Sequence, residues 1–242
     1  DGITYNKEYT DLGALALTHW QYDASEDKLT LENFGTSYNP KSELFVYPYS
    51  GNLTVELKGN SYIYASSKSA MIIIGNVKFT GDGSLTLICD NTYALNTDYM
   101  VSITEGASLN IDGLAGVMAI KGINIDTTGN VNIHTSTRCM YTFGDLNITS
   151  GKVRLNGSDG LYSSKGNVYI SGGATDVEVK SQSKAFALYG EDVAIIFAFR
   201  YIIMDSLHNH GRFLFLDDTN YFADKFFRIV LEQIELAFLN AL

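Results

Sequence analysis

Aromatic side chains are the residues of this chain best suited to contact a partner molecule. The sequence contains 16 tyrosines, 13 phenylalanines and one tryptophan. Tyr169 stands between Val168 and Ile170, so on a strand its ring would point away from the apolar side. A tyrosine on a flat sheet can stack on a pyranose ring while its hydroxyl bonds the sugar hydroxyls. We therefore expect Tyr169 to be the first candidate for carbohydrate binding.

Three further tyrosines recur at similar places along the chain, namely Tyr141, Tyr162 and Tyr189. Each follows an apolar residue in a short patch, and the patches are 21 to 27 residues apart. The three rings could form an exposed ladder along a glycan, or they could be stacked inside the core. We favour the core for two of the three and keep all three as carbohydrate-binding candidates.

Acidic residues offer a second kind of chemistry. Asp90 and Asp112 fall near equivalent turns, which makes them the candidates for a metal site, with calcium as the ion. Calcium takes six to eight oxygen ligands at one point, and the spacing does not bring three carboxylates into one column. Asp is also a common turn former. We therefore expect no cofactor, with calcium as the alternative, and no catalytic cluster of carboxylates beside a Lys or Arg on one outward face.

The elements that must position these residues are revealed by a repeat. Apolar pairs with the i, i+2 spacing of one strand face recur every 22 to 25 residues. These pairs are Leu53/Val55, Val77/Phe79, Val101/Ile103, Ile123/Ile125, Leu146/Ile148, Val168/Ile170 and Val193/Ile195. A fixed period of this size is typical of a solenoid, in which one coil cannot bury its apolar face alone.

Each repeat has internal structure. A second series of apolar pairs follows the first: Leu85/Leu87, Leu109/Ile111, Val131/Ile133, Val153/Leu155 and the weaker Thr175/Val177. Between the two series lies a column of Gly83, Ala107, Gly129, Gly151 and Gly173, where we expect turns with positive φ. A third apolar patch closes each coil. The sequence thus predicts an all-β fold, a right-handed parallel β-solenoid with three short strands per coil and about seven coils.

Both ends differ from the middle, which divides the chain into residues 1–27, 28–193 and 194–242. Leu29 and Leu31 lie 24 residues before Leu53 and Val55 and begin the first coil. In the first segment, we expect Trp20 to cover the N-terminal end of the apolar stack. The third segment carries eight of the 13 phenylalanines. We interpret it as a cap with a helix from Tyr221 to Leu239, the alternative being a tail foreign to the solenoid.

Charge and composition exclude several classes of partner. The formal net charge is −10 and the pI is about 4.8, which argues against nucleic acid, because phosphate binding requires clustered Lys and Arg. The sequence contains no run of 18 apolar residues, so we expect no membrane span. Cys89 and Cys139 fall in non-equivalent columns of different coils, and we expect both to be thiols. We also expect a monomer.

Several motifs resemble a known group of proteins. They are Trp20-Gln-Tyr-Asp, Lys28-Leu-Thr-Leu-Glu-Asn, Asn52-Leu-Thr-Val-Glu-Leu-Lys-Gly-Asn-Ser, Gly83-Ser-Leu-Thr-Leu and Gly144-Asp-Leu-Asn-Ile-Thr-Ser-Gly-Lys-Val. They resemble secreted or wall-attached bacterial β-solenoid domains, which are similar in shape to pectate-lyase-type β-helices. The resemblance covers roughly residues 20–193 and implies an extracellular or cell-wall location.

The function expected from these features is that of a non-catalytic surface module. Such a module would bind a polysaccharide or cell-surface glycan weakly, or would serve as a rigid spacer or adhesin. The alternative is a polysaccharide lyase or hydrolase that acts along one face of the solenoid. Fold alone does not decide between them.

Overall fold

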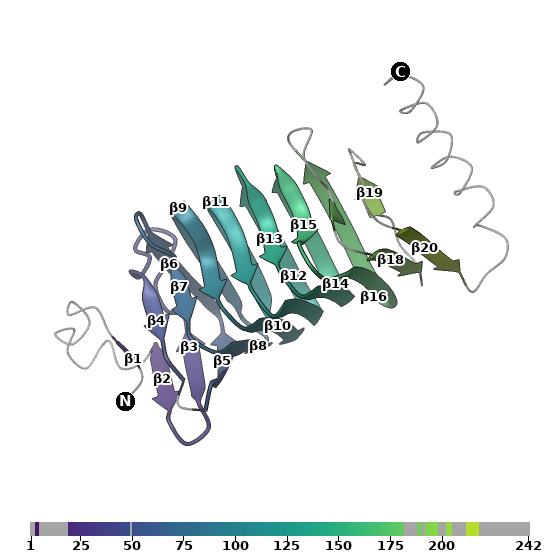
Figure 1. The fold of residues 1–242 in the computed structure, drawn as a ribbon. Helices are drawn as coiled ribbons and strands as arrows, with labels where there is room; N and C mark the ends of the chain where they lie inside the picture. The colour runs from purple at the N-terminus through teal and green to yellow at the C-terminus, as the bar shows by residue number, and fades with distance from the viewer. Residues whose placement is uncertain are drawn as a thin grey trace.

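The computed structural model describes residues 3–4, 19–48, 50–181, 188–189, 192–197, 202–204 and 212–217. These residues form strands and connecting turns, with no helix among them, and the fold is a parallel β-solenoid of about six turns. Figure 1 shows the strands side by side along one long axis, from the purple N-terminal strands to the green ones. The described residues contain no helix that is long and apolar enough to cross a membrane. The predicted all-β parallel β-solenoid is confirmed, with about six turns where about seven coils were expected.

The first wall of the solenoid contains the first series of apolar pairs. Its strands are β3 (Lys28–Glu32), β5 (Asn52–Lys58), β8 (Asn76–Gly81), β10 (Met100–Glu105), the first parts of β12 (Gly122–Thr135), β14 (Asp145–Gly157) and β16 (Val168–Ser181), then β18 (Asp192–Phe197) and β20 (Arg212–Asp217). All neighbours pair in parallel. From Leu53 to Ile195 every predicted pair lies opposite the next one, for example Val101 opposite Ile123.

Two more walls complete each coil. The second wall comprises β6 (Asn60–Ala65), the first parts of β9 (Ser84–Thr97) and β11 (Ser108–Ala119), the second parts of β12, β14 and β16, and β19 (Ile202–Met204). The third wall comprises β4 (Leu44–Val46), β7 (Met71–Ile73), the second parts of β9 and β11, β13 (Arg138–Thr142), β15 (Asp159–Ser163) and β17 (Leu188–Tyr189). The longest strands bend at a corner and therefore serve two walls.

The predicted register is wrong by two residues at two places. Leu29 lies opposite Val55, not Leu53, because the first coil spans 26 residues (55 − 29). On the second wall Val153 lies opposite Val177, so the last pair there is Val177/Val179. The extra two residues enter at a corner, between the partners of Ile148 and Ser150. A shift of two residues keeps each side chain on its face, so the inward pattern survives both changes.

The core is a stack of inward side chains from all three walls. Ile103, Ile123, Leu146 and Val168 are fully buried, and Ile125 is 1% exposed. Burying each such side chain stabilises the fold by roughly 1.5–3 kcal/mol. Both cysteines are free and buried in this core, which confirms the expected thiols.

The corner glycines are explained by close approach between coils. Among the glycines of the predicted column, Gly151 has a positive φ of 109°, whereas Gly83 and Gly129 do not fall among the positive-φ residues, so the predicted turn geometry is wrong for these two. A Cβ added to Gly129 would lie 2.5 Å from the carbonyl oxygen of Ala107 in the preceding coil. Real atoms do not come this close, so these corners require glycine for lack of space.

Strand β2 (Trp20–Asp23) and its Trp20 lie at the N-terminal end of the solenoid. This strand pairs antiparallel with β3, and both Trp20 and Tyr22 pack against the core. Strand β1 (Ile3–Thr4) pairs antiparallel with β4 on the third wall. Such pairing removes unpaired strand edges that would otherwise attract another chain. The predicted helix from Tyr221 to Leu239 lies outside the described residues.

Candidate functional site

The outer surface of the third wall carries a cluster of rings, which we call the aromatic face: Tyr93, Tyr141, Phe143 and Tyr162, with Arg138 beside them. Tyr141 lies opposite Tyr162 in the next coil, and the backbone of Tyr162 lies opposite that of Tyr189. Tyr141 and Tyr162 are half-buried and alternate with buried neighbours, so both point outward. The preference for a core position for two of the three tyrosines is therefore wrong.

The rings of the aromatic face contact one another. The ring centroids of Tyr141 and Tyr162 are 5.6 Å apart, and those of Tyr93 and Tyr141 are 6.2 Å apart in a stacked arrangement. Phe143 meets Tyr141 edge-on at 5.5 Å. Aromatic pairs at such distances contribute about 0.5–1.5 kcal/mol beyond the area they bury. The face is therefore a preformed platform, because mutual packing fixes its rings.

Arg138 holds this platform together. Its guanidinium carbon lies 5.0 Å from the ring centre of Tyr141 and 4.7 Å from that of Tyr162, which is cation–π geometry. Its Nε donates to the Asp159 carboxylate at 3.0 Å. Burial by itself lowers the pKa of Arg138, but hydrogen bonds with Tyr93 and Asp159 outweigh it and raise the pKa overall. Arg138 thus places a fixed positive charge over the rings of Tyr141 and Tyr162.

Tyr169 lies on a different wall from the other candidates. It is half-buried between buried Val168 and Ile170, which confirms that it points outward on the first wall. Its partner in the preceding coil is Asn147, whose amide nitrogen donates to Asn124 at 2.9 Å. The structure therefore brings Tyr141 and Tyr162 together but leaves Tyr169 apart from them.

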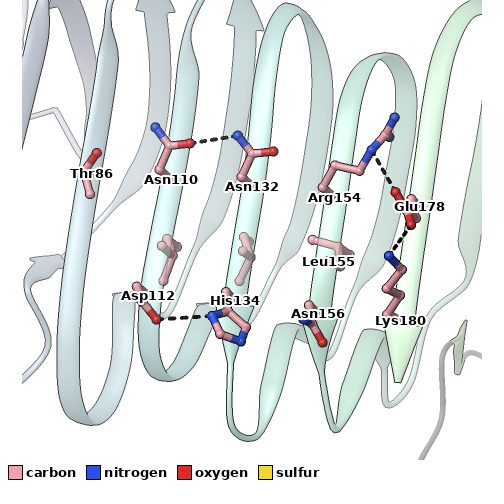
Figure 2. A pocket seen from close by; sticks show the side chains of 12 residues that line it. Thr86, Asn110, Asp112, Asn132, His134, Arg154, Leu155, Asn156, Glu178 and Lys180 are labelled. Carbon is pink, nitrogen blue, oxygen red and sulfur yellow. Dashed lines mark hydrogen bonds and ion pairs between the residues drawn. The ribbon is translucent and has the colours of Figure 1, made fainter. Parts of the chain in front are cut away.

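A second outer feature, which we call the polar groove, lies on the second wall (Figure 2). It is a shallow depression of about 310 Å³. Its lining consists of Thr86, Asn110, Ile111, Asp112, Asn132, Ile133, His134, Arg154, Leu155, Asn156, Glu178 and Lys180. Two columns of outward side chains cross the coils here, one from Thr86 to Glu178 and one from Asp112 to Lys180.

Side chains from successive coils interact along the groove, as the dashed lines of Figure 2 show. The amide nitrogen of Asn132 donates to the amide oxygen of Asn110 at 2.9 Å. His134 Nδ1 lies 3.6 Å from the Asp112 carboxylate. Farther along the first column Arg154 contacts Glu178, so polar side chains of neighbouring coils pair at both ends of the groove.

Arg154 is bonded on several sides. Its Nη2 donates to the Asp176 carboxylate at 2.7 Å and its Nε contacts Glu178 at 3.1 Å. Its Nη1 donates to the carbonyl oxygens of Val153 and Asp176. Lys180 contacts the other oxygen of Glu178 at 2.7 Å.

This group of two carboxylates beside an Arg and a Lys was missed by the sequence reasoning, which expected no such cluster. The signal was available, because Asp176, Glu178 and Lys180 alternate with the inward Val177 and Val179. The hydrogen bond from Lys180 lowers the pKa of Glu178, and the charge of Arg154 lowers it further. A general acid of a glycosidase needs a raised pKa, so Glu178 is suited to an ion pair and not to proton donation.

The two metal candidates are not equivalent positions. Asp112 lies opposite Ile88, whereas Asp90 follows Cys89, the partner of Gly113. Asp90 accepts a hydrogen bond of 2.7 Å from the Tyr64 hydroxyl, and Asp112 lies beside His134. Over the described ranges, no three His, Cys, Asp or Glu residues are grouped so that they could hold a metal ion. The expectation of equivalent turns is therefore wrong for this pair.

No protein-family model, curated protein or solved structure matches this chain. The interpretation of the two outer features therefore depends on their own geometry.

Proposed function

We propose that this chain is a non-catalytic extracellular surface module that binds neutral polysaccharide weakly through its aromatic face. The supporting observation is the ladder of Tyr141 and Tyr162, with ring centres 5.6 Å apart on the outer surface of a sheet. Strands of successive coils are about 4.8 Å apart, a step similar to the length of one sugar in an extended glycan. Adjacent rings can therefore contact adjacent sugars.

The charge of the chain favours a neutral ligand. With a net charge of −10, the protein repels polyuronates unless cations screen the repulsion. The continuous core also suits a rigid spacer, because each coil packs on its neighbours from Leu29 to Val179. We place such a module, as a monomer, outside the cell or on the cell wall.

Affinity electrophoresis in gels that contain a neutral polysaccharide, such as xylan or β-glucan, tests this proposal. We expect the gel to retard the protein, and we expect Tyr141→Ala and Tyr162→Ala each to reduce the retardation. Tyr38→Ala is the matched control, because Tyr38 is 99% exposed and lies outside the aromatic face. Tyr169→Ala measures the contribution of the first wall to the retardation. Equal retardation of the wild type and the Tyr141 and Tyr162 variants would refute the role of the aromatic face.

A further inference from the structure

We propose that the polar groove is a second binding site, which holds a segment of an uncharged oligosaccharide along the solenoid axis through hydrogen bonds. The inference depends on the proposed function for the class of ligand. Its location is independent of the aromatic face, because the groove lies on the second wall and shares none of the ring residues.

The charge of the groove selects an uncharged ligand. Its lining contains two basic side chains, Arg154 and Lys180, and two acidic ones, Asp112 and Glu178, so the formal sum is zero with His134 neutral. Three of the four charges are paired locally, since Arg154 and Lys180 both contact Glu178, and the fourth, Asp112, lies 3.6 Å from His134 Nδ1. An ionic ligand would have to displace these pairs, whereas a hydroxyl group can bond beside them.

The amide pair leaves both kinds of hydrogen-bonding group available. Asn132 donates to the oxygen of Asn110, so the Asn110 nitrogen and the Asn132 oxygen remain without a protein partner among the described residues. A sugar hydroxyl donates one hydrogen bond and accepts others. A pair of hydroxyls can therefore bond to an amide donor and an amide acceptor in neighbouring coils.

The shape of the groove suits a chain and not a compact molecule. It extends from Thr86 on β9 to Lys180 on β16, across five neighbouring strands of the second wall. Four steps of about 4.8 Å give a length of roughly 19 Å. Arg154 is held by two carboxylates and two carbonyl oxygens, so this part of the lining is ordered before a ligand arrives, which lowers the entropic cost of binding.

The test uses nuclear magnetic resonance on the full chain labelled with ¹⁵N. Xylohexaose and cellohexaose are the uncharged probes, and hexagalacturonate is the acidic one. We expect the uncharged probes to shift the side-chain amide signals of Asn110 and Asn132, and we expect hexagalacturonate to bind at least about tenfold more weakly. Tighter binding of hexagalacturonate, or no shift of these two signals with either uncharged probe, overturns the inference.

Paired variants separate binding from ladder stability. Asn110→Ala/Asn132→Ala removes the groove ladder, and we expect about tenfold weaker binding of the uncharged probe from the loss of two hydrogen-bonding side chains. Asn124→Ala/Asn147→Ala removes the matching ladder on the first wall, which has the same 2.9 Å bond. This control should keep the affinity of the wild type. An equal loss in both double variants contradicts a site in the groove.

The same titration distinguishes failure of this inference from failure of the proposed function. If Tyr141→Ala and Tyr162→Ala abolish binding while the groove variant retains the affinity of the wild type, the groove inference fails and the proposed function stands. If the groove variant alone loses binding, the groove is the principal site and the role given to the aromatic face fails.

Discussion

The outer surfaces of the second and third walls are built on the same backbone but differ in chemistry. Both present side chains at the same coil spacing, and both rest on fully buried inward residues such as Val131 and Met140. The third wall presents rings that pack on one another, whereas the second wall presents amides and ion pairs. The inward residues therefore determine the fold, and the outward residues that alternate with them determine the chemistry of each surface.

Both surfaces depend on the same stack of inward side chains. A charge placed in that stack should therefore lower the stability of the fold more than a change on either surface. Ile125 is 1% exposed, and its replacement in Ile125→Asp puts an unpaired carboxylate into the core. Burial of an unpaired charge costs several kcal/mol, comparable to the whole stability of many domains. We expect this variant to give no cooperative melting transition in circular dichroism.

The adjacent outward position provides the control. Asn124 is half-buried, and its amide oxygen accepts a hydrogen bond from Asn147. A carboxylate can also accept that bond, so Asn124→Asp should lower the free energy of unfolding by about 1 kcal/mol or less. Folding of Ile125→Asp with a normal transition would mean that the assigned inward and outward faces are wrong.

The ion pairs of the second wall should make that surface sensitive to acid. The folded-state pKa of Glu178 is lowered, chiefly by its hydrogen bond with Lys180, from a usual value near 4.5. A carboxylate with a lowered folded pKa contributes stability above its unfolded pKa and loses it as the pH falls through the folded pKa. In Glu178→Gln we expect the free energy of unfolding at pH 7 to fall by about 0.5–1 kcal/mol.

The loss of stability in Glu178→Gln should depend on pH, and this dependence tests the ion pair more specifically than the value at pH 7. The difference between the wild type and Glu178→Gln in urea unfolding should shrink as the pH falls below about 4.5. Asp98→Asn is the control, because Asp98 is exposed and has no hydrogen bond or ion pair among the described residues. A difference that is constant from pH 7 to below pH 4 would show that the ion pair does not stabilise the second wall.

The fold was predictable because its information is local and repeated. The alternation of Val101, Ile103, Ile123 and Ile125 determines both the strand faces and the coil spacing, and the structure keeps it. The errors occurred where the repeat changes length, since the two extra residues at the corner that contains Gly172 alter the partners of Val153 and Leu155. A corner insertion leaves the period-two pattern intact, so periodicity alone does not reveal it.

The candidate sites were less predictable, for physical reasons. The outward direction of Tyr169 followed from the strict alternation of its apolar neighbours. Near Tyr141 the alternation is broken, because Cys139 and Met140 are consecutive and both buried, so the sequence did not reveal the direction of Tyr141. The group around Arg154 depends on contacts between coils 22 and 24 residues apart, which no local motif encodes.

The central claim is that this solenoid binds glycans without cleaving them. The most direct test measures the reducing ends and 4,5-unsaturated uronides released from xylan, pectin and alginate by the purified protein, with and without calcium. The claim predicts no release above the blank from any of the three, while the same preparation is retarded by xylan in affinity gels. Release of 4,5-unsaturated uronides would contradict it, and a requirement for calcium would direct attention to Asp90 and Asp112.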